Sequence, residues 1–238
     1  HQTGTAPEGD SQMQVEIQYR PSYALAVVSL GPGEPIQAEA GAMVSMSPGM
    51  LIETEVRGGL IGALKRSMLG GETFFINTYR APAEGGEITL APPLPGDMAA
   101  REMREETLMV QSGSYVGSSE DMEVDTKWSG AKTFFAREGL IMLRCSGSGT
   151  LVFSSYGAIH EMELGAGQSH TVDTGHLVAF TEGMGFDVRT IAGAKSTLFS
   201  GEGLVVDLTG PGKLFMQTRS DDAFLSWLIP RLPHKSSK

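Results

Sequence analysis

The chain has 238 residues and a mass of 25.3 kDa, enough for one large β domain that buries about 70% of the surface of its unfolded form. Its 28 acidic and 18 basic residues give a net charge of −10, which disfavours nucleic acid as a partner. The single cysteine, Cys145, excludes an internal disulfide and a cysteine-based zinc cluster.

The N-terminal residues, the lengths of the apolar runs and the single cysteine indicate in which cell compartment the protein is expected. Residues 1–12 carry no large apolar side chain and contain Gly, Pro and Thr, so we expect a flexible leader or a non-native extension outside the fold. No apolar run approaches the roughly 20 residues that a membrane-spanning helix needs, and no secretory signal is recognisable. Cys145 follows the apolar run LIML and is expected to be a buried structural thiol. These features predict a soluble protein in a reducing compartment, the cytoplasm.

Short apolar runs separated by glycine follow one another along the chain. The chain contains 31 glycines, about twice the usual share, and these supply the positive φ that tight turns need. The runs have strand lengths and are rich in β-branched and aromatic residues. Clear examples are residues 73–79, 87–91, 140–145, 150–155, 203–208 and 213–217. We therefore predict an all-β protein built mainly of antiparallel strands.

Helical periodicity is confined to three segments, residues 60–69, 98–106 and 223–229. The second is charged and resembles an insertion. The third belongs to the C-terminal helix and tail that we expect over residues 221–238.

One short phrase occurs three times, as GALKRSMLGGE at 62–72, GAKTFFARE at 130–138 and GAKSTLFSGE at 193–202. The copies lie about 65 residues apart, which is the signature of an internal repeat. A second match supports this frame, because residues 30–50 and 164–184 align at a constant offset of 134. The pairs at this offset are Leu30/Leu164, Gly33/Gly167, Gly41/Gly175, Val44/Val178, Gly49/Gly183 and Met50/Met184.

The repeat predicts one triplicated β domain over residues 13–220, with repeats at about 13–93, 94–156 and 157–218. One unit of about 60 residues would leave unpaired edge strands and a small core, so three units are expected to pair their edges. We expect jelly-roll-like β-sandwich units with approximate internal threefold symmetry. A closed arrangement is favoured over three sandwiches in a row, because no Pro-rich or Ser-rich linker separates the units.

Four stretches carry a family resemblance: GGLIGALKRSMLGGETFF, SSYGAIHEMEL, DTGHLVAF and SGEGLVVDLTGPGKLFMQTRS. They resemble the signature stretches of the mitochondrial-biogenesis (altered inheritance of mitochondria) family, over about residues 13–220. The resemblance implies a fold like that of the tryptophan RNA-binding attenuation protein, without its RNA binding, and a homo-oligomer. It also implies a link to membrane-complex organisation and supplies no catalytic residue. The chain departs from the pattern at Arg137 and in the charged segment 98–106.

The repeated phrase is the first candidate for partner contact. In its first copy, an apolar face lies beside Lys65 and Arg66, and it could rest on a membrane surface or in a partner's groove. The face consists of Leu60, Ile61, Leu64, Met68 and Leu69. The alternative is favoured: the apolar residues close one end of the β body, and each lysine pairs with a glutamate six or seven residues later. With threefold symmetry, Lys65, Lys132 and Lys195 would form a ring near one pole.

The C-terminus is the second candidate. Apolar side chains that include Trp227 fall at near-helical spacing before Pro230, and the tail is basic. We expect a short helix docked on its own sheet, since one helical turn with three basic residues would bind a membrane weakly.

Three histidines form the most specific candidate for an enzymatic site. His160, His170 and His176 lie within 17 residues, beside several carboxylates, and a jelly-roll host would suit a cupin-like metal centre. The spacing argues against it, because strand residues share a face only at even separations and Gly165 and Gly167 interrupt the run.

Two other segments resemble catalytic motifs but lack the surrounding structure that those motifs require. CSGSG at 145–149 lacks the strand-turn-helix setting of a serine elbow, and GAKT at 130–133 lacks the upstream glycine of a phosphate-binding loop. We therefore expect a non-enzymatic scaffold or interaction protein without a cofactor, in contact with an unknown protein partner. A peripheral membrane contact and a small-ligand-binding or metal-dependent jelly-roll enzyme remain the alternatives.

Overall fold

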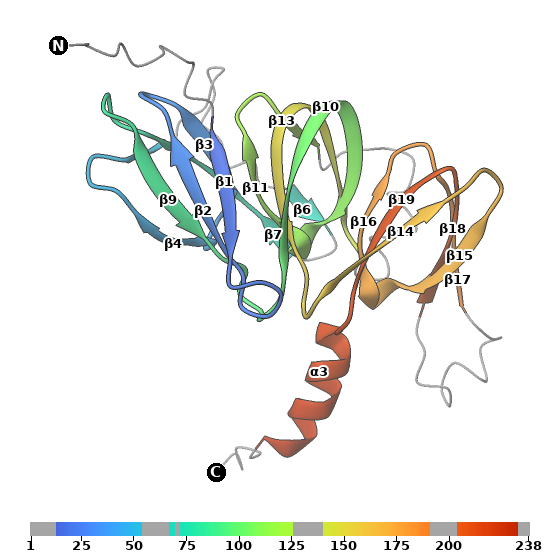
Figure 1. The fold of residues 1–238 in the computed structure, drawn as a ribbon. Helices are drawn as coiled ribbons and strands as arrows, with labels where there is room; N and C mark the ends of the chain where they lie inside the picture. Colours follow the sequence, from blue (N-terminus) through green and yellow to red (C-terminus); the bar gives the residue numbers. More distant parts are fainter. Residues whose placement is uncertain (1–12, 54–66, 70–71, 126–139, 191–203, 233–238) are drawn as a thin grey trace.

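A computed structural model describes residues 13–53, 67–69, 72–125, 140–190 and 204–232. The described residues form antiparallel sheets followed by one short C-terminal helix, as the glycine-punctuated runs predict (Figure 1). The all-β fold class is therefore confirmed.

The N-terminal part of the chain supplies two layers. Strands β2 (Leu25–Leu30), β9 (Gly86–Leu90) and β4 (Met43–Met46) pair in that order, and β1 (Gln14–Gln18) extends this sheet beyond β2. Strands β3 (Pro35–Glu39), β8 (Ile76–Arg80) and β5 (Leu51–Glu53) form the second layer. Ala26 and Ile88 from one layer share a buried cluster with Ile36 and Tyr79 from the other. A separate hairpin joins β6 (Ser67–Leu69) to β7 (Glu72–Phe74).

The C-terminal part repeats this order of pairing. Strands β14 (Ile159–Leu164), β19 (Gly212–Gln217) and β16 (Leu177–Thr181) form one layer. Strands β15 (Ser169–Asp173), β18 (Leu204–Thr209) and β17 (Gly185–Thr190) form the other, and a 3-10 turn, η3 (Thr174–His176), precedes β16. Leu164, Phe180 and Leu214 from the first layer pack with Val172 and Val206 from the second.

The middle of the chain uses two long strands in place of four short ones. Strand β10 (Met98–Gln111) pairs with β13 (Met142–Ser154) along its whole length, with a bulge between Met103 and Glu106. Strands β11 (Tyr115–Ser119) and β12 (Glu123–Asp125) pair with the two halves of β13, and η1 (Ser112–Ser114) links β10 to β11. Each half of the β10–β13 ribbon thus contributes to a different layer.

The helical periodicity assigned to residues 98–106 is wrong, because these residues begin β10. Met98 and Met103 are buried, whereas Glu102 between them is exposed and its neighbour Arg101 is partly buried. Cross-strand pairing with β13 decides the conformation, which charge spacing alone does not reveal. The helical periodicity predicted for residues 60–69 is wrong for its last three residues, because residues 67–69 form the strand β6. Residues 60–66 lie outside the described residues.

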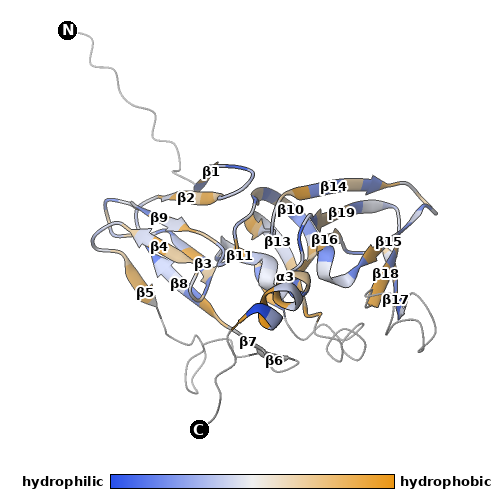
Figure 2. Ribbon diagram, turned by 90° about the horizontal axis from the view of Figure 1, so that it is seen from below, coloured by the Kyte–Doolittle hydropathy of each residue, from blue (hydrophilic) through white to orange (hydrophobic). Residues whose placement is uncertain are grey.

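Two junctions join the three parts into one long sheet. At the first, β11 pairs with β3, with Ser118 opposite Gln37. At the second, β16 pairs with β10, with Phe180 opposite Met109. The resulting sheet runs from β14 at one end to β5 at the other, and it is open. The closed arrangement that we expected is not observed, since the three parts lie side by side in a row (Figures 1 and 2). The threefold symmetry, the attenuation-protein-like fold and the repeat boundaries stay predictions.

Polar contacts reinforce the junctions. The guanidinium of Arg144 on β13 donates to Glu182, just after β16, with Nε 2.7 Å from Oε1 and Nη2 3.2 Å from Oε2. The Gln37 amide donates to the Glu120 carbonyl at 3.1 Å across the first junction. Near the start of β10, Arg20 donates to both oxygens of the buried Asp97 at 2.7 and 3.0 Å. These bonds tie neighbouring parts of the chain together at their edges.

Gly96 provides a test of close packing between segments that are distant in the sequence. A Cβ at this position would lie 1.7 Å from the Ser155 carbonyl oxygen, so Gly96→Ala should lower the free energy of unfolding by at least about 2 kcal/mol. Gly113→Ala is the matched control, because its nearest neighbour is the flexible end of Gln111 at 3.2 Å, and it should cost less than about 1 kcal/mol. Urea unfolding of both variants measures this. Equal stabilities would contradict the packing.

The Arg144–Glu182 pair predicts a pH dependence. The hydrogen bond from Arg144 lowers the pKa of Glu182 below its usual value of 4.5. A lowered folded-state pKa stabilises the fold above the unfolded pKa, and this contribution is lost as pH falls through the folded pKa. Because both side chains are about one third exposed, Glu182→Gln should cost only about 0.5 kcal/mol at pH 7. The difference from wild type, measured by urea unfolding, should shrink toward zero below about pH 4. A difference that grows on acidification would refute this assignment.

Candidate functional site

The C-terminal helix, α3 (Asp221–Leu228), begins with favourable local chemistry. Ser220 precedes it in extended conformation, and its hydroxyl accepts a hydrogen bond from the Ala223 amide at 3.4 Å. Asp221 and Asp222 place negative charge in the first turn, where it favours the helix dipole. The chain then tightens into the 3-10 turn η4 (Ile229–Arg231), which contains Pro230. Sequence and structure therefore agree on a short helix with a defined start and end.

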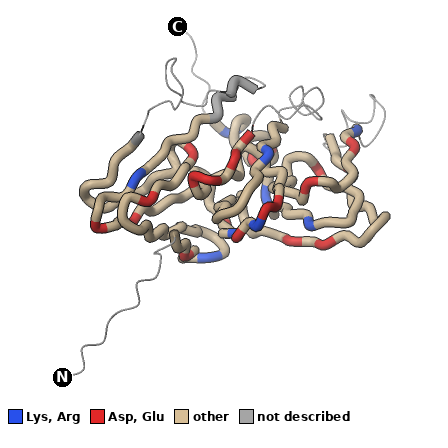
Figure 3. The backbone as a smooth tube through the Cα atoms, turned by 90° about the horizontal axis from the view of Figure 1, so that it is seen from above, with Lys and Arg blue, Asp and Glu red and all other residues tan. Residues whose placement is uncertain are grey.

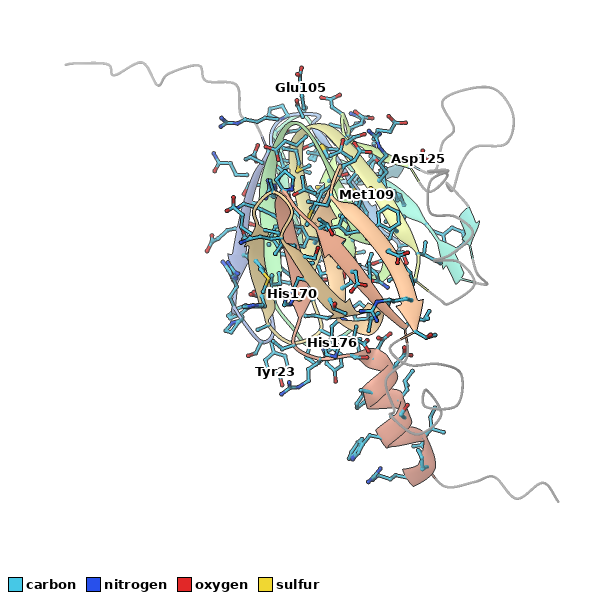
Figure 4. The ribbon with its side chains drawn as sticks, turned by 90° about the vertical axis from the view of Figure 1, so that its right-hand side faces the viewer. Tyr23, Glu105, Met109, Asp125, His170 and His176 are labelled. Carbon is cyan, nitrogen blue, oxygen red and sulfur yellow. The ribbon has the colours of Figure 1, made fainter. Side chains whose placement is uncertain are left out.

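The helix projects away from the β body and does not dock along a sheet (Figures 1 and 4). No residue of α3 is buried. The expectation of a helix docked on its own sheet is therefore wrong. Contact with the body is made at its first turn, where Phe224 lies edge-on to Tyr156 with ring centroids 6.2 Å apart. The apolar side chains left exposed along α3 and η4 are Phe224 at 37%, Leu225 at 45%, Trp227 at 55%, Ile229 at 57% and Leu232 at 50%.

Trp227 lies in the middle of this run of exposed apolar residues along the chain, and it contacts two of its neighbours. Its ring stacks near Phe224 with centroids 6.3 Å apart, and the Arg231 guanidinium lies 4.8 Å from its centroid. Arg231 also donates to the Trp227 carbonyl at 2.5 Å. The α3 surface, as we call Phe224, Leu225, Trp227, Ile229 and Leu232, therefore combines an ordered aromatic ring with a cation.

A polar hollow of about 400 Å³ lies at the base of α3, between the middle and C-terminal parts of the body. Ser154 and Ser155 at the end of β13, Gln217 at the end of β19, and Asp221 and Asp222 of α3 line part of it. Gln217 is held in place, since its side-chain amide donates to the Gly175 carbonyl at 2.9 Å and its side-chain oxygen accepts from the Tyr156 amide at 2.8 Å. The hollow offers hydroxyl, amide and carboxylate groups without a histidine among its lining residues.

The structure does not bring the three candidate histidines into one site. His160 is exposed on β14, His170 lies on β15 in another sheet, and His176 lies in η3 (Figure 4). The His176 Nδ1 is 2.7 Å from the Gln217 carbonyl oxygen, which engages this ring with the backbone. Among the described residues, no group of three or more His, Cys, Asp or Glu side chains could hold a metal ion.

The remaining sequence candidates have different outcomes. Met68 lies in β6, and Trp227 lies in α3. Leu60, Ile61, Leu64, Lys65, Arg66, Lys132 and Lys195 lie outside the described residues. Over the described backbone, basic and acidic residues are interspersed and do not gather on separate faces (Figure 3). No helix in the described part of the chain is long and apolar enough to cross a membrane.

Cys145 is a core residue of β13 and pairs with Val124 across the sheet. Burial raises the pKa of its thiol to about 12, so the reactive thiolate is scarce at neutral pH. The prediction of a buried structural thiol agrees with this environment.

Only Trp227 was named from the sequence as a candidate at the C-terminus, and the other exposed apolar residues of the α3 surface were missed. A helix meant for a sheet carries one apolar stripe, whereas residues 224–232 carry apolar side chains at adjacent positions, so they cannot all face one sheet. That signal was available in the sequence.

Comparisons with known proteins agree on the family. The model of the family described as "Mitochondrial biogenesis AIM24" matches residues 15–219, so the chain belongs to this family. It is 27% identical over 236 residues to an uncharacterised protein of Streptococcus pyogenes serotype M6, covering 96% of this chain and 94% of that protein. An X-ray structure of a Streptococcus pyogenes protein from a structural genomics consortium is similar with a TM-score of 0.76 at 26% identity. That similarity covers 93% of this chain and all of the other.

The buried position of Cys145 predicts its reactivity. In the folded protein the thiol should resist labelling by a water-soluble aromatic disulfide at pH 8, and it should react stoichiometrically after unfolding in guanidinium. Release of the coloured thiolate measures both states. Rapid labelling of the folded protein would show that Cys145 is accessible and would reopen a nucleophilic role.

Proposed function

We propose that the protein is a non-enzymatic interaction protein whose β body presents the α3 surface to a protein partner. The observation that carries the proposal is the exposure of Trp227, Leu225 and Ile229 on a helix that leaves the body. Burying large apolar side chains of this kind contributes about 1.5–3 kcal/mol each. Trp and Arg are also enriched among the residues that dominate binding energy, and here Arg231 lies over Trp227.

The charges near the helix favour a protein groove over a lipid surface. Amphipathic helices that bind membranes carry several basic residues beside the apolar ones. Here the first turn of α3 carries Asp221 and Asp222, and the one basic residue described between them and Leu232 is Arg231. The net charge of −10 would also oppose approach to anionic lipids. A helix that inserts its apolar side chains into a partner's groove is a common recognition mode. A partner that belongs to a membrane complex would agree with the link to membrane-complex organisation that the family resemblance implies.

The alternative function, a small-ligand-binding or metal-dependent enzyme, rests on the hollow at the base of α3. His160, His170 and His176 are spread over separate elements, so they do not supply ligands there. Elemental analysis of the purified protein distinguishes the two functions. A stoichiometric transition metal would overturn the proposal as stated.

Partner capture tests the proposal directly. Protein purified from its native host should carry a partner in defined stoichiometry, and the double variant Trp227→Ser and Leu232→Ser should capture at least about tenfold less of it, since residues of this kind are worth about 2 kcal/mol or more. Tyr23→Ser is the control, because Tyr23 is an aromatic residue with 75% exposure in the turn between β1 and β2 and does not belong to the α3 surface.

Two outcomes would contradict the proposed surface. One is capture of the same partner by the double variant at the wild-type level. The other is sedimentation with vesicles of neutral and anionic phospholipid that is lost in the double variant, which would make lipid the ligand of α3.

A further inference from the structure

Strands β4 and β15 are edge strands at opposite ends of the row (Figures 1 and 2). In the described part of the chain, β4 pairs with β9 and β15 pairs with β18, and each has its other side unpaired. An unpaired strand edge presents a row of backbone donors and acceptors that can accept another strand.

The two junctions within the chain show how such edges are used. Strand β11 pairs with β13 of its own part and with β3 of the preceding part. Strand β16 pairs with β19 of its own part and with β10 of the preceding part. Strand β4 occupies the corresponding place beside β9, and among the described residues no strand pairs with its other side.

The registers show that β4, β11 and β16 are equivalent residue by residue. Met46 lies opposite Ile88, Ser118 opposite Leu151 and Phe180 opposite Leu214. Each strand also has a register shift at the same distance before this residue, between Met43 and Ser45, Tyr115 and Gly117, and Leu177 and Ala179. Because all three strands have the same irregularity at the same position, we treat them as equivalent strands of a repeated unit.

Exposure differs sharply between these equivalent positions. Val44 is 59% exposed, whereas Val116 and Val178 at the internal junctions are 1% and 0% exposed. Met46 is 38% exposed, whereas Phe180 is 1% exposed. Strand β4 also contains no lysine or proline that would discourage pairing. The exposed edge of β4 therefore carries apolar residues at positions that are buried in the two internal junctions.

Strand β15 supplies the complementary edge. It spans Ser169–Asp173, which lies at an offset of 134 from β3 at Pro35–Glu39. It pairs with β18 as β3 pairs with β8. Since β3 accepts β11 at the first junction, β15 has the edge that would accept a strand of the β4 type.

We propose that copies of this chain associate head to tail, with β4 of one copy pairing antiparallel with β15 of the next. The internal junctions set the register. Ser118 faces Gln37 and Phe180 faces Met109, and the position equivalent to Gln37 at the offset of 134 is Thr171. Met46 therefore faces Thr171 of the next copy. Contacts of this kind join different surfaces, and they close into a ring when the rotation per copy allows it.

The inference deepens the self-association expected from the family resemblance, and it uses residues distinct from the α3 surface. Sedimentation velocity of the wild-type protein should show a species larger than the 25.3 kDa chain. Val44→Lys should shift it to the monomer, because a buried unpaired charge at the junction is costly. Ile52→Lys is the control, since Ile52 is 45% exposed on a neighbouring strand, β5, and should leave the oligomer intact. A monomeric wild type, or equal dissociation of both variants, would overturn the proposal.

Disulfide trapping tests the register. Under mild oxidation the double variant Met46→Cys and Thr171→Cys should form covalently linked multimers. The double variant Met46→Cys and Ser169→Cys, displaced by two residues, should form about tenfold fewer, because antiparallel side chains two positions apart lie too far from each other for a strain-free disulfide. Equal linking of both double variants, or linking of the Met46→Cys single variant alone, would overturn the register. The Trp227 and Leu232 variants should remain oligomeric, so failure of partner capture and failure of self-association can be told apart.

Discussion

Edge-to-edge hydrogen bonding between neighbouring parts of the chain is the constraint on which this structure depends. Each part of the chain has two layers, built of short strands at the ends of the row and of the two halves of β10 and β13 in the middle. A unit of that size leaves unpaired edges and a small core. The pairings of β11 with β3 and of β16 with β10 remove these edges inside the chain and make one continuous sheet. The bonds of Arg144 with Glu182 and of Gln37 with Glu120 lie beside the same junctions.

The arrangement of the row also determines where the protein can meet other molecules. Strand β19 ends beside the polar hollow, and α3 starts four residues later, so the helix leaves the body at the boundary between its middle and C-terminal parts. Among the edges that stay unpaired in the described residues, β4 and β15 lie at opposite ends of the row and match the strands that pair at the internal junctions. Contact through the ends and contact through α3 therefore use separate surfaces, and an assembled row could present several copies of the helix at once.

Many strands could be predicted from the sequence, because each is a short apolar run bounded by glycine turns. Apolar runs bounded by glycine marked β9, β13, β18 and β19, and the offset of 134 relates residues that the structure places in β4 and β16. The charged start of β10 was misjudged, since pairing along β13 overrides the helical spacing of its charges. The open row was misjudged as well, because closure depends on strand twist and on the angle between units, which residue patterns do not encode.

The candidate site was less accessible to sequence reasoning. The histidines are close in sequence, but the turns around Gly165 and Gly167 send His160 and His170 to different sheets. The apolar positions of α3 were visible in the sequence. Its direction was not, because contacts between distant residues, such as that of Phe224 with Tyr156, hold its start against the body. Tertiary geometry, more than residue type, decides whether such a helix covers its own sheet or remains available to a partner.

The central claim is that the junction strands make the three parts one cooperative structure. Hydrogen exchange measured by mass spectrometry at increasing urea concentrations tests it most directly, because it reports protection separately for the strands of each part. The account predicts that the amides of β9, β13 and β19 lose protection in a single transition with a common free energy. Loss of protection in β9 or β19 at clearly lower urea, while β13 stays protected, would show that the parts unfold independently and would contradict it.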